Sequence, residues 1–176
     1  MSLIDEYLDH DDLSHLQDQE KAFTVVSKET IRRLSPRKPI SLSPEHTLQE
    51  AIHLMQDKRI GAVIIAEKKV PVGIFTERDL LFKVLKTNPD LNQAKLREYM
   101  TPDPVTLFIE DKIAFALNQM TLGGFRHLPV VDEKGHLTGI VSVKDIVEYL
   151  AGLVPEEVYN LRPTPLRSGF QTAEGG

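Results

Sequence analysis

The stretch Gly73-Ile74-Phe75-Thr76-Glu77-Arg78-Asp79 occurs a second time as Gly139-Ile140-Val141-Ser142-Val143-Lys144-Asp145, at an offset of 139 − 73 = 66. Each copy has a glycine, two apolar residues, a hydroxyl residue, two variable positions and an aspartate. Apolar residues at helical spacing follow both copies. The pattern predicts a strand that turns directly into a helix, twice in one chain.

The hydroxyl residue and the aspartate of each copy have two interpretations. Thr76-x-x-Asp79 and Ser142-x-x-Asp145 have the spacing of a capping box, in which side chains satisfy free backbone N–H groups. The same helix end can bind an anion, because its N–H groups and dipole favour negative charge. A hydroxyl and a carboxylate there can also hydrogen-bond a sugar. Two such ends are candidate binding sites, and the capping interpretation stays open beside them.

The residues before each copy repeat as well. Residues 39–42, a capping box from Thr47 to Glu50 and the apolar run 61–66 predict a strand, a helix and a buried strand. The same order follows a polar connection, residues 90–98. Equivalent residues in this part are 65 positions apart: Pro39 and Pro104, Ala51 and Ala116, Met55 and Met120. The sequence therefore predicts an α+β fold with two β-α-β-β-α units.

Four segments are expected along the chain. Residues 1–29 are predicted to form an acidic helical N-terminal arm, 30–90 the first unit, 97–152 the second unit and 153–176 an extended C-terminal tail. Residues 1–20 contain seven Asp or Glu and no Lys or Arg, while the whole chain has a net charge of −5. The remainder is thus close to neutral and lacks a basic stripe, which argues against a nucleic-acid partner.

Several function classes find little support in the sequence. The chain has no cysteine and no apolar run of about 18 residues, so we expect neither disulfides nor a membrane span, and a cytoplasmic location. The start of the chain lacks the pattern of a signal peptide. Consecutive residues in Asp9-His10-Asp11-Asp12 cannot all face one ion, so we expect no metal. Neither a nucleophile with its base nor a Walker-type loop is found, and we expect no enzyme and no cofactor.

These features resemble a tandem pair of cystathionine-β-synthase (CBS) domains, a Bateman module, over roughly residues 30–152. The resemblance rests on the repeated strand order, on Met100-Thr101-Pro102, on Arg126-His127-Leu128-Pro129-Val130-Val131-Asp132, and on the Gly-h-h-Thr/Ser-x-x-Asp pattern (h, apolar) that ends both units. It implies that the units pack about a pseudo-twofold axis, leave two clefts, and associate as a homodimer.

The resemblance also implies a ligand. Clefts in this family bind adenosine-containing molecules such as AMP, ADP, ATP or S-adenosylmethionine. Asp79 and Asp145 would then accept hydrogen bonds from ribose hydroxyls, and Thr76 and Ser142 would meet ribose or phosphate. The residues expected near the adenine are Ile40, Val63, Val105 and Leu128, with Pro129 also assigned to the site. The residues expected near phosphate are Arg126, His127, Arg78 and Lys144.

The expected function is a regulatory module that binds an adenine nucleotide and relays this event to a partner protein. The alternative is a structural dimerisation domain with empty clefts. The first unit has Gly61-Ala62-Val63-Ile64 where the second has Arg126-His127-Leu128-Pro129, so only the second unit supplies two cations. The sequence leaves open which cleft these cations face. We expect one cleft to bind better than the other.

Overall fold

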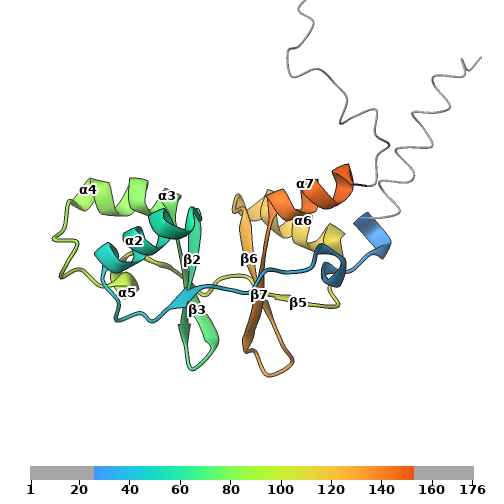
Figure 1. Cartoon of the computed structure of the whole chain (residues 1–176), viewed down its shortest axis with the longest axis horizontal. Helices are drawn as coiled ribbons and strands as arrows, with labels where there is room; N and C mark the ends of the chain where they lie inside the picture. The colour runs from blue at the N-terminus through green and yellow to red at the C-terminus, as the bar shows by residue number, and fades with distance from the viewer. Residues whose placement is uncertain (1–25, 153–176) are drawn as a thin grey trace, which may run out of the picture.

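The computed structural model describes residues 26–152, which form two α+β units side by side (Figure 1). The central strands of the two units face each other in the middle of the molecule, and the helices lie on the outer sides. The α+β prediction and the repeat of two units are confirmed. Most of the expected arm, the acidic cluster with Asp9 to Asp12, and the expected tail lie outside the described residues.

The first unit is built on a four-stranded sheet with the strand order β1-β2-β3-β4. Its strands are β1 (Ser41–Leu42), β2 (Ala62–Glu67), β3 (Val70–Thr76) and β4 (Thr101–Pro102). Its helical segments are α2 (Leu48–Lys58), α3 (Glu77–Asp79), η2 (Leu80–Val84), α4 (Leu85–Thr87) and α5 (Leu96–Tyr99). The three segments from Glu77 to Thr87 follow one another without a break, and η2 is a turn of π-helix.

The second unit repeats this plan on a three-stranded sheet with the order β5-β6-β7. Its strands are β5 (Leu107–Phe108), β6 (His127–Val131) and β7 (Leu137–Ser142). Its helices are α6 (Ile113–Gly123) and α7 (Val143–Ala151). In both sheets the first strand runs parallel to the second, and the second and third form an antiparallel hairpin.

Three predicted capping boxes are present, and they fix where the helices begin. The hydroxyls of Thr47, Thr76 and Ser142 each accept a hydrogen bond from the backbone N–H three residues later. The carboxylates of Glu50, Asp79 and Asp145 accept one in return from the backbone N–H of the cap residue. Each strand-to-helix turn therefore holds its carboxylate in a fixed position beside the end of a strand.

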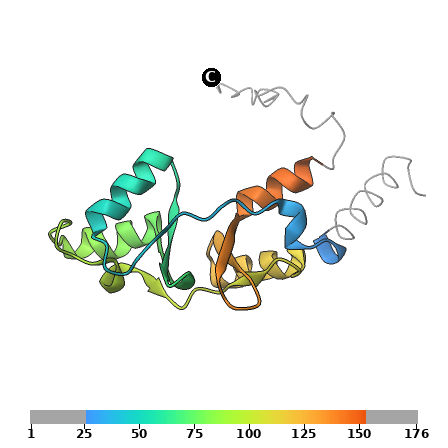
Figure 2. The ribbon, with the colours of Figure 1, turned by 60° about the horizontal axis from the view of Figure 1, so that its bottom comes forward.

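The segment that precedes each unit packs on the other unit. Ile31, in the 3₁₀-helix η1 (Ile31–Leu34), is fully buried in the second core, and Leu96, in α5, is fully buried in the first. Ile31 donates its N–H to Asp111 O at 2.8 Å, and Leu96 donates its N–H to His46 O at 2.9 Å. Ile31 and Leu96 are equivalent, because they are related by the offset that relates Pro39 to Pro104. Figure 2 shows the segment before the first unit, here called its lead-in segment, crossing from the second unit to the first.

This exchange corrects one sequence expectation. Residues 90–98 are more than a polar connection, because Leu91, Ala94 and Leu96 all pack on the first core. The predicted helical arm, residues 1–29, ends in a helical turn at Lys28, and a separate 3₁₀-helix, η1, follows after Thr30. In both places a few apolar residues among polar ones are buried by the neighbouring unit.

Candidate functional site

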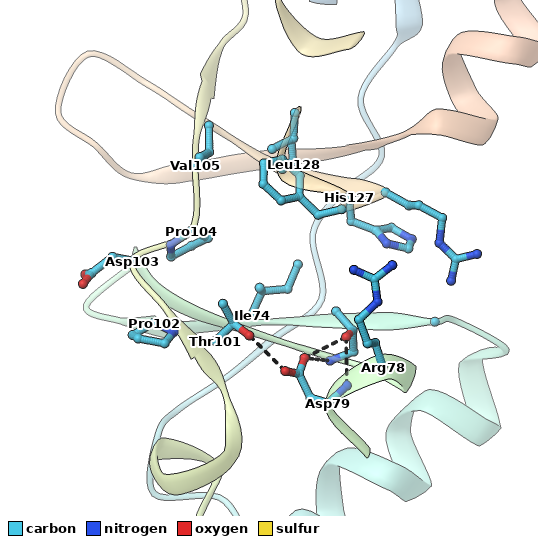
Figure 3. A pocket seen from close by; sticks show the side chains of 15 residues that line it. Ile74, Arg78, Asp79, Thr101, Pro102, Asp103, Pro104, Val105, His127 and Leu128 are labelled. Atoms are coloured by element: carbon cyan, nitrogen blue, oxygen red, sulfur yellow. Dashed lines mark hydrogen bonds between the residues drawn. The ribbon is translucent and has the colours of Figure 1, made fainter. Parts of the chain in front are cut away.

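A pocket of about 250 Å³ lies between the two units, where β3 and β4 of the first face the start of β6 in the second (Figure 3). This volume lies just below the usual range for small-molecule sites, about 300–1,000 Å³. Its lining residues are Gly61, Ile74, Thr76, Arg78, Asp79, Thr101, Pro102, Asp103, Pro104, Val105, Gly123, Phe125, Arg126, His127 and Leu128. Both units contribute, so a ligand here would contact both.

Asp79 lines the pocket, and its contacts come from its own helix and from strand β4. Oδ2 accepts hydrogen bonds from the backbone N–H of Thr76 at 2.9 Å and from the Thr76 hydroxyl at 2.7 Å. Oδ1 accepts from the Thr101 hydroxyl at 2.9 Å and lies 2.7 Å from Lys83 Nζ. Figure 3 shows Asp79 with Thr101 beside it. The carboxylate is thus fixed by its own helix and by strand β4.

The environment of Asp79 keeps it ionised. Burial alone would raise its pKa, but hydrogen bonds from Lys83, Thr76 and Thr101 outweigh burial and hold the pKa below its usual value. A buried, ionised carboxylate with fixed orientation is a suitable acceptor for the hydroxyls of a sugar.

Three basic side chains form the opposite end of the pocket. Arg78 follows the cap of α3, and its Nη1 donates to Gly124 O at 2.7 Å, which joins the two units. Arg126 precedes β6 and His127 is its first residue, and Arg126 lies 3.9 Å from Glu77. In Figure 3 the Arg78 side chain reaches towards His127. The cations of the second unit therefore face the Asp79 pocket, which answers the question that the sequence left open.

The surroundings of His127 favour the neutral form of its ring. Burial, followed by the positive charge of Arg126, holds the pKa of His127 below its ordinary value. A negative charge in the pocket would favour the charged form of the ring.

Apolar side chains line another part of the pocket. Ile74, Val105 and Leu128 surround its centre in Figure 3. Leu128 is almost fully buried, whereas Val105 is 38% exposed. This part of the pocket offers an apolar surface of the kind that a flat aromatic ring requires.

The remaining predicted site residues lie away from this lining. Ser142, Lys144 and Asp145 stand together at the start of α7, in the position equivalent to Thr76, Arg78 and Asp79. Ile40 precedes β1 and is partly exposed. Val63 on β2 and Pro129 on β6 are buried. Asp145 Oδ1 accepts a hydrogen bond from Arg37 Nε at 3.1 Å, and Arg37 Nη2 contacts the same oxygen.

Sequence reasoning missed part of the site. Thr101 and Pro102 were quoted only as markers of the second unit, although both line the pocket and Thr101 binds Asp79. Lys83 and Arg37 were given no role, although each binds one of the two key aspartates. For Lys83 the i, i+4 spacing from Asp79 was a usable signal. For Arg37 no local signal exists, because its partner is 108 residues away.

Two further classes of site are absent from residues 26–152. No group of three or more His, Asp or Glu side chains is placed there to hold a metal ion. No helix in that range is long and apolar enough to cross a membrane.

Comparisons with known proteins agree with this architecture. Protein MK0525 of Methanopyrus kandleri is 34% identical over 133 residues, which cover 73% of this chain and 68% of the relative. The structure of the CBS-domain protein ATU1752 of Agrobacterium tumefaciens is similar with a TM-score of 0.62 and 31% identity, covering 68% of this chain and 98% of that one. The CBS-domain protein PAE2072 of Pyrobaculum aerophilum, solved in complex with AMP, has a TM-score of 0.62 and 26% identity, covering 70% and 99%.

The family itself is identified by a model described as the CBS domain, which matches residues 29–86 and again residues 96–152. The two matches correspond to the two units that carry the repeated Gly-h-h-Thr/Ser-x-x-Asp pattern. The chain therefore belongs to the CBS-domain family and contains a tandem pair of CBS domains.

Proposed function

We propose that this protein is a regulatory module that binds an adenine nucleotide of the AMP class in the Asp79 pocket and relays binding to a partner protein. One observation carries the proposal. The pocket is lined by a fixed, ionised carboxylate, by apolar side chains and by a group of cations. A ribose, a purine and a phosphate require these three environments.

The position of the pocket suggests how binding could be relayed. Asp79 and Arg78 belong to the first domain, whereas Arg126 and His127 belong to the second. A ligand that contacts both groups favours one relative arrangement of the domains over others. The proposal includes no catalytic step.

The AMP complex of the Pyrobaculum relative supports the choice of ligand class. AMP carries one phosphate, and the cationic end of the pocket has Arg78, Arg126 and His127 to receive it. ADP, ATP and S-adenosylmethionine are members of the same adenosyl class and belong in the test. The cytoplasm is the compartment that we propose, on the sequence argument that the chain has no cysteine.

The experiment is a thermal-shift and calorimetric titration with AMP, ADP, ATP and S-adenosylmethionine on protein freed of carried-over ligand. We expect AMP to raise the melting temperature and Asp79→Asn to abolish the shift. Arg32→Ala is the control, because Arg32 is an exposed arginine paired with Glu110 and does not line the pocket. If none of the four ligands changes the melting temperature, the ligand-sensing function is wrong.

A structural module with empty clefts is the second candidate, and one observation favours it. Both oxygens of Asp79 already have partners, Thr76 on Oδ2 and Thr101 with Lys83 on Oδ1. A carboxylate that serves only the helix cap and its surroundings needs no ligand. Under this function Asp79→Asn changes stability and affects no binding.

Association into a homodimer is part of both candidates. Helices of both domains expose large apolar side chains, which marks surfaces that associate. These residues are Leu81, Phe82, Leu85, Phe115, Leu122 and Val147. Phe82 is 66% exposed and Leu122 78%. We expect a dimer by sedimentation velocity, and weaker association in Phe82→Gln or Leu122→Gln, with Lys86→Gln as control. A wild-type monomer at all concentrations would contradict this part of the proposal.

A further inference from the structure

The two repeated aspartates have the same cap but different second partners. Oδ2 of Asp79 and Oδ2 of Asp145 both accept from the backbone N–H and hydroxyl of their cap residues, Thr76 and Ser142. Oδ1 of Asp79 binds the Thr101 hydroxyl and Lys83. Oδ1 of Asp145 binds the guanidinium of Arg37.

Arg37 occupies the position that Thr101 occupies in the first domain. Thr101 lies opposite Ile74 on the edge of the first sheet, and Arg37 lies opposite Ile140 on the edge of the second. Ile74 and Ile140 are equivalent, because each follows the glycine of the repeated pattern. Because Thr101 lines the Asp79 pocket, Arg37 projects from a position that lines the equivalent region beside Asp145.

Lys83 contacts the same oxygen of Asp79 as Thr101 does, and its Nζ also donates to the Thr101 hydroxyl at 3.1 Å. It belongs to η2, its Nζ donates to the carbonyls of Tyr99 and Met100 at 3.1 Å, and it does not line the pocket. The residue equivalent to Lys83 in α7 is Tyr149, so that helix supplies no ammonium to Asp145. The two carboxylates therefore receive positive charge from different parts of the chain: Asp79 from its own helix, and Asp145 from the segment before the first unit.

The cations that would hold a phosphate are also unequal. Arg126, just before β6, and His127, its first residue, line the Asp79 pocket. The equivalent residues are Gly61, just before β2, and Ala62, its first residue, and they carry no charge. Beside Asp145 the cation is Arg37, and its guanidinium already binds the Asp145 carboxylate.

We infer that the guanidinium of Arg37 occupies the Asp145 carboxylate in place of a ligand. Each chain then binds one adenosyl ligand, at Asp79. The second site becomes available only when this guanidinium moves away from Asp145. The inference rests on the proposed function. The guanidinium brings two N–H donors and a positive charge to the carboxylate, whereas a ribose hydroxyl brings an uncharged donor. At Asp79 the corresponding cleft-side donor is the neutral hydroxyl of Thr101.

The test counts bound AMP by calorimetry on the full-length chain. Arg37→Thr places at Arg37 the residue type found at Thr101, and Arg37→Gln gives a second, longer neutral side chain. We expect about one AMP per chain for the wild type and about two for both variants, with the Asp79 affinity unchanged. Asp145→Asn in the Arg37→Thr background should return the count to one. Arg33→Thr is the control, since Arg33 pairs with Glu29 instead.

Two outcomes would overturn the inference: a wild-type count of two, or a count of one that Arg37→Thr and Arg37→Gln both leave unchanged. Failure of the proposed function gives a different result. If the wild type binds no AMP while the Arg37 variants bind one that Asp145→Asn removes, the Asp79 assignment is wrong and the role of Arg37 stands. If neither the wild type nor the variants bind AMP, both are wrong.

Discussion

Lys83 Nζ lies 2.7 Å from Asp79 Oδ1 and donates at the same time to the carbonyls of Tyr99 and Met100. One ammonium therefore connects the carboxylate of the candidate site with the segment that joins the two domains. Lys83 lies in the π-helical turn η2, and π-helical turns often occur at functional sites. A change in the contacts of Asp79 therefore also changes the hydrogen bonds of Lys83 to this segment.

Replacing Lys83 by Met is expected to destabilise the protein by about 1–3 kcal/mol at neutral pH, because a buried carboxylate and two carbonyls lose a charged donor. The pKa of Asp79 is held below its usual value, so its stabilising contacts are present above about pH 4 and are lost as the pH falls through the folded-state pKa. The difference between wild type and variant should therefore shrink in acid. Urea unfolding at pH 7 and pH 3 measures it, with the exposed Lys86→Met as control. An equal difference at both pH values would contradict the assigned contact.

The exchange of lead-in segments predicts unequal effects at two equivalent glycines. A Cβ added at Gly139 would lie 2.8 Å from Cβ of Pro36, whereas one added at Gly73 would meet the flexible end of Met100. We expect Gly139→Ala to cost about 1–3 kcal/mol in the free energy of unfolding, because the proline cannot move without its backbone. Gly73→Ala should cost less. Chemical denaturation of both variants tests this, and a reversed order would mean that the lead-in does not pack on the second domain as described.

His127 predicts a pH dependence of ligand binding. Burial and Arg126 hold its pKa below the ordinary value of about 6.5, so it is neutral at pH 7. A phosphate in the pocket would favour the charged ring, and AMP affinity should gain from this as the pH falls. The phosphate itself gains a proton near about pH 6, which acts in the opposite direction.

The contribution of His127 is isolated by comparison with His127→Gln, which has the same phosphate chemistry. We expect the ratio of wild-type to variant affinity for AMP to rise between about pH 8 and about pH 6. The sign for stability is opposite. The unfolded state takes up the proton more readily, so the ligand-free wild type should lose stability against the variant over the same range. A ratio independent of pH would remove His127 from the phosphate end.

Much of the fold could be predicted because the chain contains two copies of the same sequence pattern, which can be compared with each other. A single Thr76-x-x-Asp79 pattern indicates only a cap, but its recurrence at Ser142 and Asp145 locates two strand-to-helix turns. The apolar run 61–66 and the capping box at Thr47 give the order of elements. These signals are local in sequence, and the structure confirms them.

The exchange between domains was not predicted, because it depends on contacts between distant segments. Ile31 and Leu96 share the offset of the other repeated residues, so their equivalence was visible in the sequence. The sequence did not show which core each of these two residues enters. The contact of Arg37 with Asp145 depends on the same exchange. The predicted ligand residues also include six outside the Asp79 pocket, and their roles stay predictions.

The central claim is that the Asp79 pocket holds the phosphate of an adenine nucleotide on cations from the second domain. The most direct test is calorimetry of AMP and of adenosine with the wild type and Arg126→Ala, whose side chain is 68% exposed and tolerant of replacement. We predict that Arg126→Ala weakens AMP binding by about 10-fold or more, as expected for loss of a charged hydrogen bond, and leaves adenosine binding within about twofold. An equal loss for both ligands, or no loss for AMP, would contradict the claim.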